Sequence, residues 1–125
     1  MQPVNWQTVP TERIADGVER QVIWGEKSTL ARFRFGKGTH VARHDHASEQ
    51  VTCVIEGALR MQLEGRDLQI GSGEVLVIPP DVEHEVWFLE DSVVIDFFAP
   101  PRDDWKAGQS HYLAGQATPP RKEGT

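Results

Sequence analysis

Short runs of β-forming residues, separated by turn residues, follow one another along most of this 125-residue chain. Several runs alternate apolar and polar side chains, and no stretch repeats apolar residues with a helical period of 3.6 over several turns. The pattern predicts eight strands, over residues 21–24, 29–35, 51–56, 59–63, 67–70, 74–78, 84–89 and 92–98. It also predicts one helical turn within residues 101–108.

This many short strands would leave long unpaired edges in one open sheet, which two stacked sheets or a closed barrel avoid. The run 29–35 shows the alternation expected of such a fold. Ala31, Phe33 and Phe35 share one face of the strand, and the intervening positions, two of them arginines, share the other. We therefore expect an all-β fold in which this strand has one buried and one polar face.

The size and charge of the chain limit its organisation and partners. We expect one domain over residues 1–115 and a flexible tail over residues 116–125. The net charge of −6 and the lack of a lysine and arginine cluster argue against a nucleic-acid partner. No apolar run is long enough for a transmembrane helix, so no membrane partner is expected. With a single cysteine, Cys53, and no signal-peptide features near the N-terminus, a cytoplasmic location is favoured.

Three of the five histidines stand close together. Residues two apart in a strand point to the same face, so His44 and His46 can direct two imidazoles at one point. Gln50 can reach the same point if the chain continues inward as a strand. His40 shares the parity of His44 and is a possible further ligand, but it follows a glycine-rich turn and we expect it to be exposed.

The spacing around these residues is more specific than the histidine pair alone. One pattern reads Gly38-x5-His44-x-His46-x3-Gln50-x6-Gly57, and a second reads Gly73-x5-Pro79-x-Asp81-x2-His84. Together they resemble the two sequence motifs of the cupin superfamily, over roughly residues 21–105. Gln50 stands where glutamate is usual, and Asp81 stands where glycine is usual.

The resemblance implies a cupin double-stranded β-helix, which is a jelly-roll barrel, with one metal ion on His44, His46, Gln50 and His84. Three neutral imidazoles and one amide oxygen suit a divalent transition metal, such as Zn, Ni, Fe or Mn, better than Mg or Ca. These ligands carry no charge, so the ion keeps its full charge and should attract an anionic oxygen such as a carboxylate or enolate. Positions left open on the ion would be available for catalysis.

The predicted strand 92–98 contains a carboxylate, Asp96, among apolar residues. A charged residue is rarely buried without a partner or a function. Two interpretations stay open: an ion pair with Arg102 or Arg34, or a general acid and base that lines the barrel.

Residues 89–105, together with His46-x2-Glu49-Gln50, resemble more narrowly the KdgF-like pectin-degradation cupins, which open the rings of unsaturated uronate sugars. The resemblance implies that Asp96 moves a proton, Phe98 shapes the pocket wall and Arg102 clamps a sugar carboxylate through two hydrogen bonds. Trp87 is expected as a further substrate contact.

The first expectation is therefore a metal-dependent isomerase or lyase that acts on a small carboxylated, sugar-like substrate. The bulky pair Trp87 and Phe88 equally suits an aromatic substrate, as in a polyketide-cyclase-like or oxygenase cupin. A third possibility is a non-catalytic module that binds a metal or a small molecule. By resemblance to other small cupins, a homodimer is expected.

Overall fold

The structure of the protein is a computed structural model, which describes residues 1–106. It contains a short 3-10 helix, ten strands and one helical turn. They are η1 (Trp6–Thr8), β1 (Glu12–Ala15), β2 (Val18–Trp24), β3 (Thr29–Phe35), β4 (His40–His44), β5 (Glu49–Glu56), β6 (Ala58–Leu63), β7 (Arg66–Gly71), β8 (Val75–Ile78), β9 (His84–Phe88), β10 (Ser92–Ala99) and α1 (Asp103–Lys106).

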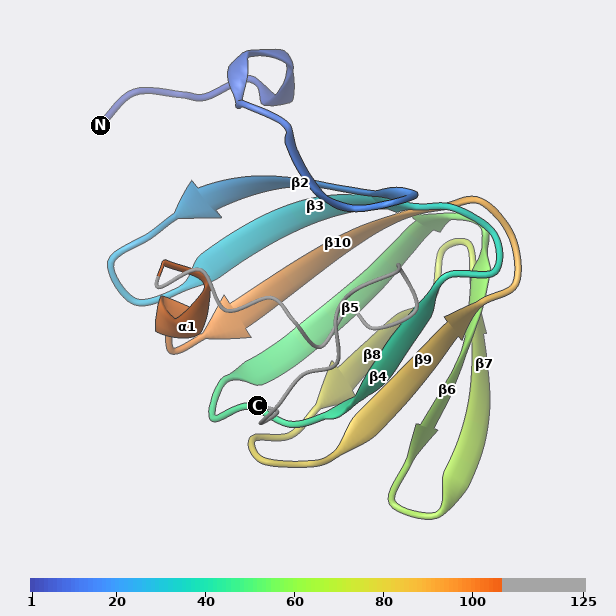
Figure 1. The fold of residues 1–125 in the computed structure, drawn as a ribbon. Coiled ribbons are helices and arrows are strands. Elements are labelled where there is room, and N and C mark those ends of the chain that lie inside the picture. The colour runs from blue at the N-terminus through green and yellow to red at the C-terminus, as the bar shows by residue number, and fades with distance from the viewer. Residues whose placement is uncertain (107–125) are drawn as a thin grey trace.

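The strands form two antiparallel sheets that face each other (Figure 1). The larger sheet has the order β1-β2-β3-β10-β5-β8, and the smaller one has the order β4-β9-β6-β7. From β3 onward the chain crosses to the other sheet at every connection except the β6–β7 hairpin. This winding is that of a jelly-roll barrel, so the expected all-β fold is confirmed.

All eight predicted strands are present, with their ends displaced by at most three residues. Two observed strands were not predicted, β1 and β4. Neither has an apolar alternation: no residue of β1 is fully buried, and in β4 only Val41 is. Both strands therefore owe their conformation to pairing with β2 and β9 rather than to their own sequences.

The core lies between the two sheets. Ala31, Phe33 and Phe35 of β3 are buried, as the alternation predicts, while Arg34 is exposed. The ring of Phe35 stacks on Phe33 at 4.9 Å and on Phe88 at 4.0 Å between centroids. These stacked rings join the two sheets, because Phe33 and Phe35 belong to β3 and Phe88 belongs to β9.

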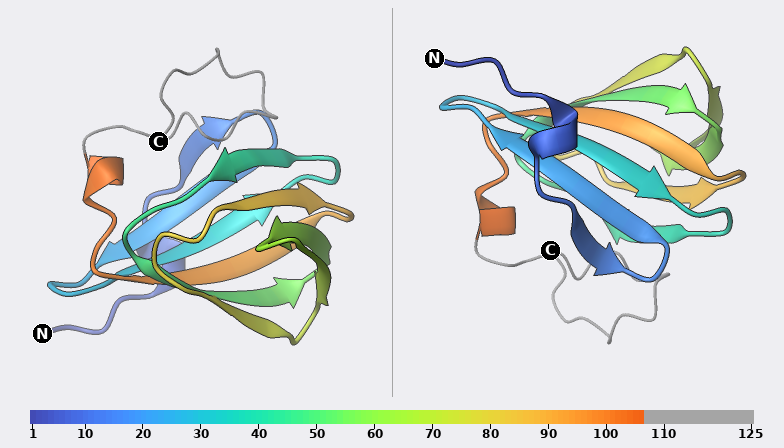
Figure 2. Two further views of the ribbon diagram at one scale, coloured as in Figure 1. Left: turned by 90° about the horizontal axis from the view of Figure 1, so that it is seen from below. Right: turned by 90° about the horizontal axis from the view of Figure 1, so that it is seen from above.

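The helical turn α1 lies at one end of the barrel, and η1 lies outside the six-stranded sheet (Figure 2). The predicted turn within residues 101–108 is thus present as α1, and its residue Trp105 is buried. The expected domain end at residue 115 and the tail over 116–125 lie outside the described residues. No helix within residues 1–106 has the length and apolar character needed to cross a membrane.

Candidate metal centre

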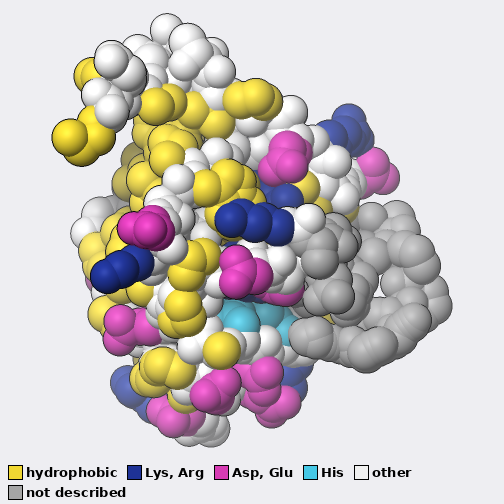
Figure 3. Space-filling view, turned by 90° about the vertical axis from the view of Figure 1, so that its left-hand side faces the viewer, with side chains coloured by type: hydrophobic (Ala, Val, Ile, Leu, Met, Phe, Trp, Pro, Cys, Tyr) yellow, Lys and Arg dark blue, Asp and Glu magenta, His cyan; other side chains and the backbone are white. Residues whose placement is uncertain are grey.

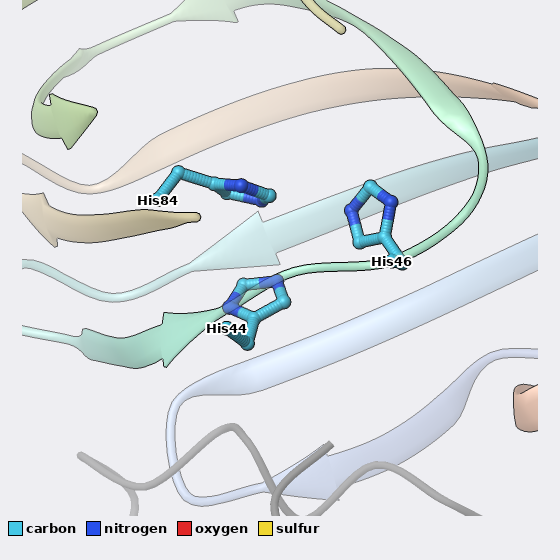
Figure 4. Close-up of side chains that lie close together, drawn as sticks. All are labelled: His44, His46 and His84. Carbon is cyan, nitrogen blue, oxygen red and sulfur yellow. The ribbon is translucent and has the colours of Figure 1, made fainter. Parts of the chain in front are cut away.

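Three histidines from different parts of the chain meet at the polar end of the barrel. His44 ends β4, His84 begins β9, and these two residues are paired across the strands. His46 lies in the connection from β4 to β5. One ligand atom from each ring lies within 4.8 Å of the others, and Figure 4 shows the rings turned toward a common point.

Each of the three rings is held by a backbone carbonyl two residues away. The distances from Nδ1 to the carbonyl oxygen are 2.8 Å for His44 to Ala42, 2.9 Å for His46 to Ser48 and 2.8 Å for His84 to Val82. A carbonyl only accepts hydrogen bonds, so Nδ1 carries the proton and donates it, and Nε2 is the acceptor nitrogen of each neutral ring. Nε2 of His84 is buried and has no hydrogen-bond partner among the described residues. The rings are thus oriented as metal ligands are.

Gln50 of β5 places a side-chain oxygen beside the three histidines. Its Oε1 lies 3.0 Å from Nε2 of His46, and its amide nitrogen donates to Oγ1 of Thr52 at 2.8 Å. With Nδ1 of His46 donating to Ser48, both Nε2 and Oε1 are acceptors, and two acceptors this close repel each other unless a cation lies beside them. One divalent ion bound by His44, His46, His84 and Gln50 would satisfy all four groups.

The protonation of the histidines also suits a metal. Burial lowers the pKa of His84 to about 4 and that of His46 below its usual value. The pKa of His44 is lowered well below 6.5, mainly by burial and to a smaller extent by repulsion from a protonated His84. The rings are therefore neutral near pH 7, as metal binding requires.

A cavity of about 50 Å³ is lined by His44 and His84, by Asp96 and Phe98 of β10, and by Arg102, which follows β10. This volume holds an ion with a few water molecules. On the molecular surface, histidine side chains are visible beside acidic and apolar groups (Figure 3). His44 and His46 are both half-buried, whereas His84 is buried.

Asp96 lies on β10 with its side chain directed into the barrel, opposite Thr52 of β5. Burial raises the pKa of its carboxyl to about 6, against the opposing effects of hydrogen bonds from Thr52 and Gln50 and of the charge of Arg102. Its Oδ1 has no hydrogen-bond partner among the described residues. A carboxylate with such a pKa can both take up and release a proton near neutral pH.

Phe98 and Arg102 form the wall beside the histidines. The ring of Phe98 lies edge-on to His46, with centroids 5.5 Å apart. The guanidinium of Arg102 lies 4.8 Å from the centre of the Phe98 ring and is itself buried. Among the described residues its carboxylate partner is Asp104, at 2.6 Å, and Arg34 lies exposed on the other face of β3.

Trp87 and His40 are on the outer face of the smaller sheet, away from the cavity. Trp87 packs between His40, at 5.3 Å, and the guanidinium of Arg60, at 4.1 Å. The residues of β9 that line the cavity are His84, Val86 and Phe88. Their side chains point to the face of the strand opposite to that of Trp87. The structure therefore does not bring Trp87 to the other predicted site residues.

A β-bulge explains why His40 and His44 do not share a face. The register of β4 against β9 shifts between Val41 and His44, so one extra residue separates the two histidines in the ladder. His40 instead places Nε2 2.6 Å from a carboxylate oxygen of Glu85. His40 thus lies away from the other three histidines, and it is half-buried rather than exposed as expected.

Two residues beside the site, Thr52 and Asp104, were missed by the sequence reasoning. Thr52 lies two residues after Gln50 in β5, so both side chains point to the same face of the strand. This spacing could have identified Thr52 from the sequence. Asp104 lies two residues after Arg102, and only the path of the chain into α1 brings the two side chains together.

Comparison with known proteins agrees with this geometry. The family described as cupin domain matches residues 31–98, which is more than half of the chain. This protein is a cupin. The matched span contains the three histidines, Gln50 and Asp96, and it ends at Phe98, before Arg102.

Solved structures similar to this cupin include an RmlC-like cupin from Shewanella frigidimarina NCIMB 400, with 26% identity, a TM-score of 0.76, and coverage of 82% of this chain and 93% of that one. KdgF from Halomonas sp. is 29% identical, with a TM-score of 0.72 and coverage of 77% and 90%. A predicted oxalate decarboxylase from Thermotoga maritima, at 18% identity, a TM-score of 0.70 and coverage of 79% and 99%, shares the fold. A search of curated proteins gave no match.

Proposed function

We propose that this cupin is a metal-dependent enzyme that opens the ring of a small unsaturated uronate. The observation that carries the proposal is the placement of a buried carboxylate, Asp96, and a buried guanidinium, Arg102, on the cavity that adjoins the converging histidines. The similarity to KdgF supports the same substrate class, as does the resemblance of residues 89–105 to pectin-degradation cupins.

The reaction is an isomerisation that needs no outside oxidant or reductant. A proton leaves the anomeric hydroxyl, the bond from the anomeric carbon to the ring oxygen breaks to give an aldehyde and an enolate, and a proton is added to C4 of that enolate to give a ketone. Asp96 can accept the first proton and donate the second, because its raised pKa of about 6 makes both forms accessible near neutral pH.

The other residues bind and orient the substrate. A guanidinium pairs with a carboxylate through two parallel hydrogen bonds, so Arg102 is suited to hold the uronate carboxylate. A divalent ion, when bound by the three histidines and Gln50, supplies a Lewis acid for a substrate oxygen. Since the cavity of about 50 Å³ does not enclose a sugar ring, the ring would lie across the mouth with its reacting oxygens directed inward.

Metal analysis with an ultraviolet assay tests the proposal. Purified wild type and the His44→Ala and His84→Ala variants are compared for bound metal and for loss of the conjugated absorbance of 4,5-unsaturated galacturonate. His40→Ala is the matched control, because this histidine lies on the outer face. We expect metal and metal-dependent decay in wild type and His40→Ala, and neither in the two site variants.

Other outcomes lead to different conclusions. Bound metal with decay no faster than the spontaneous rate would reject the uronate substrate and favour an aromatic substrate or a binding module. Absence of metal from wild type, even after reconstitution with zinc, nickel, iron or manganese, would reject the metal centre itself.

A further inference from the structure

Arg102 has a carboxylate partner of its own, two residues further along the chain. Its Nε donates to Oδ1 of Asp104 at 2.9 Å, and its Nη2 donates to Oδ2 at 2.6 Å. This side-on, two-bond geometry fixes both the position and the plane of a guanidinium. The pair lies where the chain leaves β10 and enters α1.

Aromatic rings fix the guanidinium from other directions. The rings of Phe98 and Trp105 lie 4.8 and 4.6 Å from it, and they pack edge-on to each other at 5.1 Å. Trp105 is held in turn by Phe33, at 5.9 Å, and by the guanidinium of Arg20, at 4.4 Å. Arg102 therefore lies in a rigid setting that extends into the barrel core.

In the Arg102–Asp104 pair, the carboxylate of Asp104 lies on the solvent side of the guanidinium. The side chain of Arg102 is 3% exposed and that of Asp104 is 35% exposed. Arg102 lines the cavity, and its charge acts on the pKa of Asp96 and of all three histidines. A buried guanidinium without a counter-ion is costly, so Asp104 allows this positive charge to face the metal centre.

We propose that Asp104 is a positioning residue for carboxylate recognition, because it holds the Nε edge of Arg102 and thereby sets how the guanidinium faces the cavity. The inference rests on the proposed function in one respect, namely that Arg102 binds the substrate carboxylate. The neighbouring Asp103 provides a matched comparison: it is exposed, it lies in the same helical turn, and it has the same charge.

The first test observes the pair itself, without a substrate. In the zinc-loaded protein labelled with nitrogen-15, the Nε–H signal of Arg102, assigned through Arg102→Lys, should exchange slowly with water. We expect Asp104→Asn to accelerate this exchange at least tenfold, Asp104→Glu to restore part of the protection, and Asp103→Asn to leave it unchanged. An unchanged signal in a folded, metal-loaded Asp104→Asn variant would overturn the proposal.

The second test measures carboxylate recognition with two unreactive probes, galacturonate and galactose, which differ in the carboxylate. We expect the preference of the zinc-loaded wild type for galacturonate to fall on the order of tenfold in Asp104→Asn, to recover in part in Asp104→Glu, and to persist in Asp103→Asn. A stronger preference in Asp104→Asn would show that Asp104 competes with the ligand, and would also overturn the proposal.

The two tests separate this inference from the proposed function. If wild type binds neither sugar and converts no unsaturated uronate, the proposed substrate class fails. The exchange of the Arg102 Nε–H then still decides whether Asp104 positions the guanidinium.

Discussion

His44 and His84 face each other across the β4–β9 pair, with ring centroids 4.3 Å apart, and each donates its Nδ1 proton to a backbone carbonyl. Two imidazoles this close cannot both be protonated without strong repulsion. The fold therefore keeps this pair of rings neutral, as the binding of a cation requires.

The first prediction concerns the retention of metal on acidification. Burial lowers the pKa of the three histidines, to about 4 for His84, so protons compete with the metal only well below the usual histidine value of 6.5. Zinc-loaded protein dialysed between pH 8 and 4 should keep most of its zinc at about pH 6 and release it between about pH 5 and 4. Release of half of the zinc above pH 6.5, measured by atomic emission, would contradict this.

The second prediction is that the ionised Asp96 side chain lowers the free energy of unfolding of the metal-free protein. Its pKa is raised from 3.8 to about 6 in the folded state, so the metal-free protein loses stability as the pH rises through this range. Asp96→Asn removes the effect. It should raise the free energy of unfolding by roughly 2–3 kcal/mol at pH 7 and by little at pH 4.

Urea unfolding of the metal-free proteins at both pH values measures this difference. The same variant should abolish uronate conversion while it keeps the metal, since Asp96 is not a ligand. A variant that is less stable than wild type at pH 7 would show that the Asp96 carboxylate stabilises the fold.

The third prediction concerns two motif glycines with positive φ angles, Gly38 at 89° and Gly57 at 92°. A Cβ at Gly57 would overlap the Oγ of Ser92 and lie 2.6 Å from the backbone oxygen of Asp91, whereas a Cβ at Gly38 would have no atom within 4 Å. Gly38→Ala should thus cost about 1 kcal/mol from backbone strain alone, and Gly57→Ala several times more. Equal midpoints in urea for the two variants would argue against this.

The fourth prediction is that the protein forms a homodimer through the outer face of the larger sheet. Val75 and Val77 of β8, Ile55 of β5 and Phe97 of β10 are 59%, 52%, 47% and 41% exposed. Val51, Cys53 and Ile95 lie on the same face, and no charged side chain separates them. A second copy of this apolar face can cover it, since sheets pack face to face through apolar side chains.

Light scattering should therefore give twice the chain mass for wild type. Val77→Lys, on this face, should yield monomers, whereas Gln69→Lys, on the smaller sheet, should leave the dimer intact. A monomeric wild type at micromolar concentration would reject the dimer.

The sequence by itself determined the strands with a strong alternation and the two motifs that contain the four expected ligands. In β3, side chains two apart share a face whatever the rest of the chain does, so the apolar face with Phe33 is the buried one. In β10 the same geometry puts Asp96 on one face with Phe98, but both faces are apolar, and the sequence alone did not decide which of them is buried. The spacing of the histidines and Gln50 within two motifs is likewise a property of the sequence.

The tertiary structure decided what depends on register and on the path of the chain between strands. The bulge in β4 moves His40 to the outer face, although it shares the parity of His44, because a single extra residue reverses which side is presented. The pairing of β9 with β6 places Trp87 against Arg60, outside the cavity. The partner of Arg102 depended on where α1 directs Asp104, and side-chain contacts at a chain turn cannot be derived from periodicity.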